Sequence, residues 1–432
     1  MEWVDVFVLG CSFAVLLALG VPVAFSIGIS TVLTMLLSIK TGPALTTVAQ
    51  RIATGLDSFT LLAIPFFILA GQLMNQGGIA RRLIEFAKAL LGGLPGGLAH
   101  VNVLAAMLFA AISGSSVATA SAVGSIMGPR MEEDGYERSF GAAVNITAAT
   151  TGLIIPPSNI LIVFSLASGG VSITALFLAG YLPGILVGIS LMLVAGVLAV
   201  RRRYPVAGRT GWRELSKRFL AALPSLLMLV VVMGGIVTGI FTATEAAAVA
   251  VLYALVLALA YREVTLRDLP QILLSTSATT AIVLLLVGTS IGMSWILAYE
   301  NIPQNVSLAL IGLTHNKILI LLIINLILLA VGVFMDITPA VLIFTPIFLP
   351  IAAQLGVDPT HFGIIMVLNL CIGLCTPPVG TVLFVGVGVA QTSITRVIRP
   401  LLPLYIAMIV ALMIVTYFPA LSLWLPGLFD AQ

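Results

Sequence analysis

The chain has 432 residues, of which 60% are hydrophobic and 8% are charged. Soluble domains carry about 25% charged residues because their surfaces face water, so this composition excludes an ordinary soluble domain and indicates a surface that faces lipid. The net charge of +3 does not indicate nucleic-acid binding, because in a membrane protein the positions of the charges carry the information.

Apolar segments of spanning length follow one another along the chain. A membrane-spanning helix needs about 20 predominantly apolar residues, or fewer where neighbouring helices shield its ends. The N-terminal segment contains Glu2 and Asp5 and has no basic residue before Lys40, so it is predicted to be a membrane helix and not a cleaved signal peptide. The predicted crossings are 4–19, 22–39, 57–75, 138–168, 172–200, 219–239, 242–260, 272–298, 361–390 and 400–425.

Two other apolar stretches, 98–130 and 316–353, are interrupted near their middle. The interruptions are Ser113–Gly114–Ser115–Ser116 in the first stretch and Asp336–Ile337–Thr338–Pro339 in the second. Each half of each stretch is expected to be too short for a comfortable crossing. Both stretches are therefore predicted to be re-entrant hairpins, which enter and leave on the same side of the membrane with their tips buried in protein.

One motif occurs once in each half of the chain, as Gly152–Leu153–Ile154–Ile155–Pro156–Pro157 and as Gly373–Leu374–Cys375–Thr376–Pro377–Pro378. The difference in residue number between Gly152 and Gly373 is here named the repeat offset. Consecutive prolines stop a helix, because proline lacks an N–H and its ring clashes with the preceding turn. The segments 138–168 and 361–390 are therefore predicted to be broken helices. A break that occurs once per half indicates a duplicated transporter fold.

The positions of Lys and Arg predict the orientation in the membrane. The densest basic cluster lies in 201–218, and placing this segment in the cytoplasm puts 16 of the 19 basic residues inside. The second half then repeats the first with every direction reversed, which is an inverted repeat. The predicted units are a first repeat 1–200 (scaffold helices 1–75, hairpin 98–130, broken helix 138–168), a basic cytoplasmic linker 201–218, and a second repeat 219–432 (scaffold helices 219–298, hairpin 316–353, broken helix 361–390, final helix 400–425).

The two breaks suit a cation-coupled anion site. Unpaired carbonyls at a helix break are costly in lipid unless a group coordinates them, and a sodium ion, which prefers several oxygen ligands, can fill that role. Helix N-termini opposite these carbonyls suit an anionic substrate. The alternative is that the Gly and Pro residues only shape helix packing. The pairing of two breaks with two hairpins favours the transport site.

Polar residues near the tips and breaks are the candidate sodium and substrate residues. At the first tip the alternative is a small-residue packing interface. Asp336 is an acid inside an apolar segment, which indicates function; it could cap the following helix, bind a proton or contact an ion directly. The candidates of the first half are Ser113, Gly114, Ser115, Ser116, Thr119, Asn145, Thr151, Gly152, Pro156 and Pro157. The candidates of the second half are Asp336, Thr338, Pro339, Gly373, Thr376, Pro377, Pro378 and Thr381.

Other charged residues have structural explanations. Asp57 and Glu245 precede or open apolar helices, where helix capping explains them. The alternation of charged and apolar residues in 81–90 predicts a helix that lies in the membrane interface. This helix could be an arm between a fixed and a moving domain or a plain surface helix.

Five motifs together resemble the large membrane subunit of tripartite ATP-independent periplasmic (TRAP) transporters, and they cover nearly the whole length. The motifs are Leu56–Asp57–Ser58–Phe59–Thr60–Leu61–Leu62–Ala63–Ile64–Pro65–Phe66–Phe67, Ser113–Gly114–Ser115–Ser116–Val117–Ala118, Gly152 to Pro157, Phe241–Thr242–Ala243–Thr244–Glu245 and Gly373 to Pro378. The resemblance implies an all-α polytopic protein of the bacterial inner membrane. It also implies a sodium-driven importer of organic anions such as carboxylates, including C4-dicarboxylates, or acidic sugars such as sialic acid.

The resemblance further implies an elevator mechanism, in which hairpins and broken helices slide as a transport domain against a scaffold. By motif match, the sodium regions fall on the tip Ser113–Ser116 with the loop Gly152–Pro156, and on the tip Asp336–Pro339 with the loop Gly373–Pro377. Two partners are implied, a small four-helix membrane subunit and a periplasmic substrate-binding protein. No cofactor besides the coupling sodium ion is implied.

Two alternative functions stay open from the sequence. A self-sufficient sodium–dicarboxylate symporter of related architecture would need neither partner, and a passive channel would ignore the sodium gradient. A membrane-embedded enzyme is disfavoured, because the three histidines are scattered and no nucleophile–base pair or phosphate-binding Gly-rich loop occurs.

Overall fold

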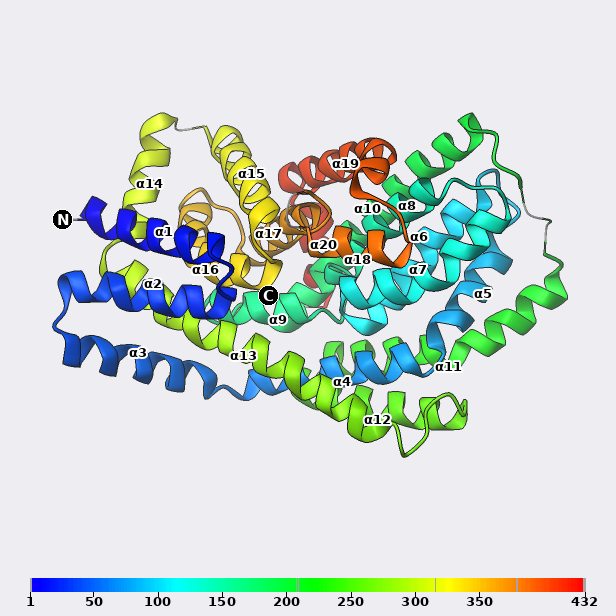
Figure 1. Ribbon diagram of the computed structural model, residues 1–432, viewed down its shortest axis with the longest axis horizontal. Helices are drawn as coiled ribbons and strands as arrows, with labels where there is room; N and C mark the ends of the chain where they lie inside the picture. Colours follow the sequence, from blue (N-terminus) through cyan, green and yellow to red (C-terminus); the bar gives the residue numbers. More distant parts are fainter. Residues whose placement is uncertain (1, 207, 209, 315, 378–379, 430–432) are drawn as a thin grey trace.

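Helices alone make up the regular structure of the described residues, which are 2–206, 208, 210–314, 316–377 and 380–429 in the computed structural model (Figure 1). Within these residues, eight helices are long and apolar enough to cross a membrane. They are Phe59–Gln76, Ile173–Arg201, Trp212–Val237, Ala243–Ala260, Leu269–Tyr299, Lys317–Phe334, Ile337–Gln354 and Ile394–Tyr417. The composition and the helix lengths together give a polytopic membrane protein.

The first half contains ten α-helices and two 3₁₀ turns among the described residues. They are α1 (Glu2–Ala18), α2 (Val23–Ser38), α3 (Thr41–Leu56), η1 (Phe59–Leu62), α4 (Ala63–Gln76), α5 (Ile79–Leu91), α6 (Gly97–Ser113), α7 (Ser116–Glu133), α8 (Arg138–Ala149), η2 (Thr150–Leu153), α9 (Asn159–Ala167) and α10 (Ile173–Arg201). Helices α6 and α7 form the first hairpin. Helices α8 and α9 are the two parts of the first broken helix.

The second half follows the same order. It contains α11 (Trp212–Val237), α12 (Ala243–Ala260), α13 (Leu269–Tyr299), α14 (Ile302–Leu313), α15 (Lys317–Phe334), α16 (Ile337–Gln354), α17 (Pro359–Gly373), α18 (Thr381–Val389), α19 (Ile394–Tyr417) and α20 (Ala420–Leu428). Helices α7 and α16 start and end at positions that differ by the repeat offset, and so do the starts of α10 and α19. One continuous helix, α13, stands where the first half has the separate helices α3 and α4.

Contacts between the halves come in exchanged pairs. Helix α4 packs on α12 while α2 packs on α13; α9 packs on α16 while α18 packs on α7; α8 packs on α19 while α17 packs on α10. When each helix is replaced by the helix at the equivalent position in the other half, the first contact of each pair becomes the second. This exchange indicates an approximate two-fold relation between the halves. Figure 1 shows the hairpins α6–α7 and α15–α16 on opposite sides of the centre of the molecule.

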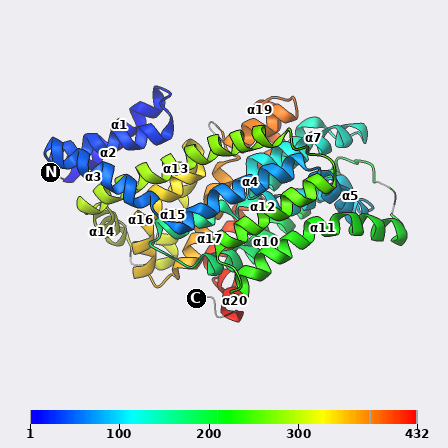
Figure 2. The ribbon, with the colours of Figure 1, turned by 90° about the horizontal axis from the view of Figure 1, so that it is seen from below.

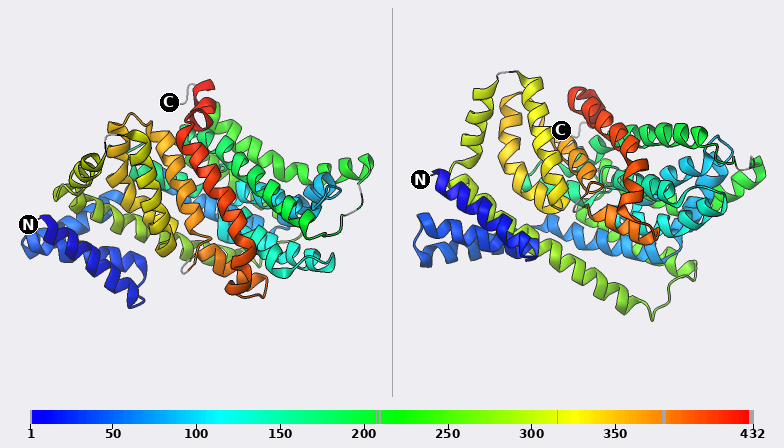
Figure 3. Two further views of the ribbon diagram at one scale, coloured as in Figure 1. Left: turned by 90° about the horizontal axis from the view of Figure 1, so that it is seen from above. Right: turned by 45° about the horizontal axis from the view of Figure 1, so that its top comes forward.

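Long helices of both halves lie beside each other along one face. Figure 2 shows α4, α12 and α13 running along this face, and α4 contacts both of the others. The C-terminal helices α19 and α20, orange to red in Figure 3, pack against α10. Helices of the second half therefore pack on helices of the first half both along this face and at α10.

The helix boundaries differ from the predicted ones in several places. Helices α3 and α14 were not predicted, and the predicted final helix 400–425 is divided at Phe418 into α19 and α20. Helix α11 begins at Trp212, so the end of the predicted linker 201–218 is helical. The predicted interface helix near 81–90 is α5.

The expectation that each hairpin half is too short to cross is wrong for the second hairpin. Helices α15 and α16 have 18 residues each, and both are long and apolar enough to span a membrane. At a rise of about 1.5 Å per residue, such a helix extends about 27 Å, close to the hydrocarbon thickness. Entry and exit of the hairpins on one side of the membrane stay a prediction.

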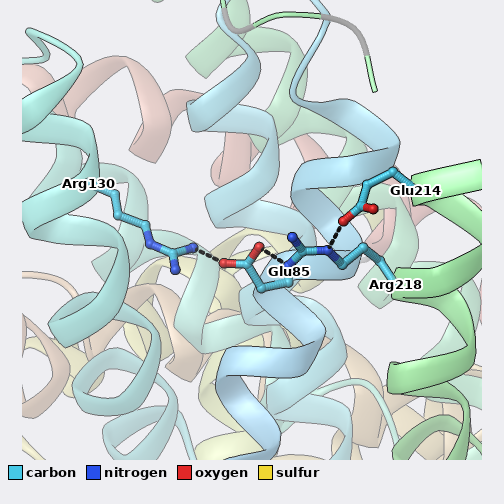
Figure 4. A network of polar contacts seen from close by, with 4 residues as sticks. All are labelled: Glu85, Arg130, Glu214 and Arg218. Atoms are coloured by element: carbon cyan, nitrogen blue, oxygen red, sulfur yellow. Dashed lines mark hydrogen bonds and ion pairs between the residues drawn. The ribbon is translucent and has the colours of Figure 1, made fainter. Parts of the chain in front are cut away.

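Ion pairs tie together one end of the molecule. Glu85 of α5 pairs with Arg130 of α7 and with Arg218 of α11, at 2.5 Å each, and Glu214 pairs with Arg218 at 2.6 Å (Figure 4). Further pairs at this end are Arg81–Glu263, Arg138–Glu132 and Arg202–Glu137. These five basic residues belong to the set that the charge bias assigns to the cytoplasm, so the fold gathers this part of the set at one end.

Candidate functional site

Both hairpin tips and both helix breaks border one cavity of about 220 Å³, here named the front cavity. The first tip contributes Ser113–Ser116, and the second contributes Asp336, Ile337 and Thr338. The breaks contribute Leu153 and Asn159 in the first half and Leu374 and Thr381 in the second, while α4 and α13 supply one wall. Segments from opposite halves of the sequence therefore meet at one site.

The first tip is a compact cluster of hydroxyl groups. Gly114 ends α6 with a φ of 61°, a left-handed conformation that glycine adopts without steric cost. Ser115 is the N-cap of α7, and its Oγ accepts a hydrogen bond from the N–H of Ala118 at 3.2 Å. The Ser113 and Thr119 hydroxyls lie 3.2 Å apart, and Thr119 also donates to the Ser115 carbonyl at 2.8 Å. The tip thus offers several neutral oxygen atoms.

The second tip carries a carboxylate in place of this cluster. Asp336 is the N-cap residue of α16, and the N–H groups of Ile337 and Thr338 face its carboxylate without completing a capping hydrogen bond. The Thr381 hydroxyl, which begins α18 beyond the second break, donates to Asp336 Oδ1 at 3.3 Å. The side chain therefore points toward the front cavity and the second break.

The first break begins where α8 ends at Ala149, and the chain regains helix at Asn159. Gly152 lies directly on α6, because a Cβ atom there would be 2.0 Å from the Cβ of Ala110. Ser158 donates to the Leu153 carbonyl at 2.6 Å. The glycine of the motif thus allows the break to pack on its hairpin, and a protein hydroxyl satisfies one of the freed carbonyls.

The second break has the same construction. Helix α17 ends at Gly373, and a Cβ atom there would be 2.5 Å from the backbone of Gly332 in α15. The Cys375 carbonyl accepts a hydrogen bond from the Tyr405 hydroxyl of α19, and Thr376 donates to the Ile372 carbonyl at 2.8 Å. Both predicted interruptions are therefore confirmed, and each break is supported by its hairpin.

Four helix N-termini point at the front cavity. The first residues of α7, α9, α16 and α18 are Ser116, Asn159, Ile337 and Thr381, and all four line it. Each helix N-terminus carries about half a positive charge. No Lys or Arg occurs among the described residues that line the cavity. The positive partial charges at this site therefore come from the backbone, and they face the carboxylate of Asp336 in the same lining.

Some predicted residues support the front cavity without lining it. Thr119 binds Ser113 at the tip, and Thr151 donates to the Ala148 carbonyl at 2.6 Å behind it. Asn145 lies elsewhere, in a second cavity between α7, α8 and α18. The other predicted residues that do not line the front cavity are Gly152, Pro156, Pro157, Pro339, Gly373, Thr376 and Pro377. Pro378 lies outside the described residues.

Three polar residues that line the front cavity are not among the predicted candidates. They are Gln72 of α4, Asn159 of α9 and Thr279 of α13. The buried Oδ1 of Asn159 has no hydrogen-bond partner among the described residues. Gln72 and Thr279 lie among other polar residues of apolar helices, and such residues also occur at helix contacts.

The chain is similar to known membrane transport proteins along its whole length. The family described as the tripartite ATP-independent periplasmic transporter, DctM component, matches residues 10–421. An uncharacterized protein, YgiK, of Salmonella typhimurium is 56% identical, over 98% of each chain. The C4-dicarboxylate TRAP transporter large permease DctM of Pseudomonas aeruginosa is 43% identical, over 93% of this chain and 94% of the relative.

A solved structure has a related fold. The YdaH transporter of Alcanivorax borkumensis aligns with a TM-score of 0.62 over 87% of this chain and 88% of its own, at 16% sequence identity. This likeness concerns the fold alone. Taken with the family match over residues 10–421, the apolar helices identify an inner-membrane transport permease and not an enzyme: the chain belongs to the DctM component family, the large permeases of tripartite ATP-independent periplasmic transporters.

Proposed function

We propose that this permease imports organic anions, carboxylates or acidic sugars, by coupling them to sodium in an elevator mechanism. The observation that carries the proposal is the convergence of four helix N-termini and two tips on the front cavity. Backbone dipoles stabilise an anion without a permanent cation that would hold it too tightly to release. The 43% identical relative is a C4-dicarboxylate permease, which supports the same substrate class.

Sodium coupling is supported by the oxygen atoms around the cavity. At the first tip, Ser113, Ser115 and Thr119 bring three hydroxyls within a few residues. At the second tip the Asp336 carboxylate faces the same cavity. Within the described residues, no group of three or more His, Cys, Asp or Glu gathers that could hold a transition metal. The available ligands are hard oxygen atoms of the kind that sodium accepts.

The elevator proposal rests on the way that the front cavity is built. Hairpins and broken helices form one side, and α4 and α13 form the other. Each break packs on its own hairpin through a glycine, so hairpin and break can move as one body. Sliding of that body along α4 and α13 would carry the cavity across the membrane.

Two partners complete the proposed importer. Permeases of this family work with a small membrane subunit and a soluble substrate-binding protein. We infer that this chain receives its substrate from such a periplasmic protein. The stand-alone symporter and the passive channel are the outcomes that would replace this proposal.

Reconstitution separates these functions. Proteoliposomes containing the permease and its small subunit are supplied with the binding protein and a labelled C4-dicarboxylate, under an inward sodium gradient or an equal potassium gradient. We expect uptake with sodium and binding protein together. Uptake without the binding protein would indicate a stand-alone symporter, and flux that ignores sodium would indicate a channel.

Two sets of variants test the site and the motion. Replacing Ser115 and Ser116 by leucine should abolish coupled uptake without preventing membrane insertion, and uptake at the wild-type rate would refute the assignment. Cysteines at Gln72 and Ala118, on opposite walls of the front cavity, should be joined by a flexible bifunctional thiol reagent. Transport at full speed after cross-linking would count against sliding.

A further inference from the structure

A second cavity lies behind the first hairpin, and the function proposed above does not use it. This rear cavity has a volume of about 210 Å³ and lies between α6, α7, α8 and α18. Its lining runs from Glu132, Glu137 and Arg138 at the turn between α7 and α8 to Gly124 and Asn145. One end therefore reaches the charged face, and the other end lies within the helices.

The lining of the rear cavity has hydrogen-bond acceptors without matching donors. Asn102 and Asn145 are 1% and 3% exposed, and the Oδ1 atom of each has no hydrogen-bond partner within the part of the chain that the structure describes. Their Nδ2 groups are occupied, by Met131 Sδ at 3.5 Å and by the Ala120 carbonyl at 2.8 Å. Buried polar atoms in a cavity of this size bind water or a ligand that supplies the missing partner.

The charges at the mouth of the rear cavity are paired. Glu132 and Glu137 line the cavity together with Arg138. Glu132 binds the Arg138 guanidinium with both of its oxygens, and Glu137 pairs with Arg202 at 2.5 Å. The preference for a hydrated cation over an anion therefore rests on the unpaired Oδ1 acceptors of Asn102 and Asn145.

The inner end of the rear cavity approaches the first tip from behind. Asn145 donates to the carbonyl of Ala120, the residue after Thr119 in the hydroxyl cluster. Gly124 follows Thr119 on α7, a rise of about 8 Å along the helix. The Asn145–Ala120 hydrogen bond between α7 and α8 thus lies between the cluster and the cavity.

The second half lacks counterparts of three glycines that line this cavity. The positions that follow Gly124, Gly128 and Gly141 by the repeat offset are occupied by Thr345, Leu349 and Phe362. Thr345 and Phe362 are fully buried, and Met366, whose sulfur contacts Thr345, stands at the position of Asn145. The glycines of the first half are therefore a local departure from the repeat, which indicates a role specific to that half.

We propose that the rear cavity is a hydrated, cation-selective vestibule through which sodium leaves the first tip toward the charged face. The Asn145–Ala120 hydrogen bond acts as the constriction between tip and vestibule. This inference rests on the sodium coupling proposed above. It adds a route for the ion that is separate from the front cavity, which the substrate uses.

The first test measures the chemistry of the cavity without reference to transport. Gly128 lines the cavity, and a Cβ atom there meets nothing within 4 Å, so Gly128→Cys places a thiol in it with little strain. The exposed Cys11 is replaced by alanine, and the other two cysteines are buried. In inside-out vesicles, small cationic and anionic methanethiosulfonates are compared, with each rate normalised to the rate with a thiol in solution.

We expect the cationic reagent to react faster than the anionic one, since the unpaired amide oxygens of the lining accept from a cation and not from an anion. Equal rates, a preference for the anion, no reaction with either reagent, or reaction only from the opposite side would each overturn the proposal. These outcomes do not depend on whether the protein couples to sodium. Failure of the vestibule and failure of the proposed function are therefore distinguishable.

The second test measures the route. Gly128→Leu fills the cavity, and Gly388→Leu is the matched control, because Gly388 is an exposed helical glycine whose Cβ atom also meets nothing within 4 Å. We expect Gly128→Leu to slow sodium-coupled uptake several-fold and to leave the half-saturating external sodium concentration unchanged. If uptake by the wild type responds to sodium, and Gly128→Leu takes up substrate as fast as Gly388→Leu does, the route is excluded.

Discussion

The two hairpin tips occupy equivalent positions and use different chemistry. Ser115 and Asp336 are separated by the repeat offset, and each is the N-cap residue of the second helix of its hairpin. Ser115 uses its oxygen for the cap, whereas Asp336 accepts a hydrogen bond from Thr381 at the second break. The residues equivalent to Ser113 and Thr119 are the apolar Phe334 and Ala340. One tip therefore presents several neutral oxygens, and the other presents one charge.

This difference indicates how a duplicated frame acquires two distinct sites. The frame is set by helix lengths and by the glycines that seat each break on its hairpin. The chemistry is set by a few tip residues that the frame does not constrain. Variants of the frame should therefore affect both halves alike, whereas variants of the tips should act on one half only.

The largest effect is expected from the glycines that seat the breaks. Gly152→Leu and Gly373→Leu each force a side chain into the backbone of the adjacent hairpin, and overpacking of this kind costs about 1–3 kcal/mol or more. We expect both variants to lose most folded protein, measured by thermal unfolding in detergent. Gly388→Leu is the control. Wild-type stability of either variant would show that the two breaks are not seated in the same way.

The next largest effect is expected from the charge at the second tip. Asp336→Asn keeps the shape and the contact with Thr381 but removes the negative charge, which would attract a nearby ion strongly in a partly desolvated cavity. We expect a rise of about tenfold or more in the sodium concentration that half-saturates uptake, because one factor of ten corresponds to only about 1.4 kcal/mol. Thr381→Ser is the conservative control. An unchanged sodium dependence would assign Asp336 a structural role.

Much of the frame was readable from the sequence, because it depends on local signals. The Pro156–Pro157 pair and its counterpart predicted both breaks, since consecutive prolines cannot continue a helix. The interruption at Ser113–Ser116 predicted the first hairpin turn. The basic residues predicted a single charged face, and ion pairs with Glu85 connect two of them, Arg130 and Arg218, across α5, α7 and α11.

Other features depend on contacts that the sequence does not record. Asn145 was placed among the first-half candidates because it precedes the break, but its position on α8 directs it into the rear cavity. The wall of α4 and α13 was missed because polar residues such as Gln72 and Thr279 also occur at contacts between apolar helices. Helix α14 was missed because its 12 residues are too few for a crossing. Each case was decided by packing between segments distant in the chain.

A smaller effect is expected at the first tip. Ser115→Ala removes the N-cap of α7 but leaves the Ser113 and Thr119 hydroxyls together. Loss of such a cap costs about 1 kcal/mol, so the midpoint of thermal unfolding should fall by a few degrees. Ser115→Thr keeps an acceptor oxygen and should restore most of the loss. If Ser115→Ala instead abolishes uptake at unchanged stability, the hydroxyl contacts the ion directly.

The smallest effect is expected at the charged face, where the halves differ again. The positions equivalent to Glu85 and Arg130 are Val306 and Ile351, so the network of Figure 4 belongs to the first half and to α11 alone. Glu85→Gln leaves Arg130 and Arg218 without their shared carboxylate.

Because these side chains are partly exposed, each pair contributes about 0–1 kcal/mol. The loss of stability should therefore stay near about 1 kcal/mol and should shrink in about 1 M salt, where charges are screened within about 3 Å. Lys88→Gln, which removes a charge from the same helix outside this network, is the matched control. A loss that persists in high salt would mean that Glu85 holds α5 between α7 and α11 by packing and not by charge.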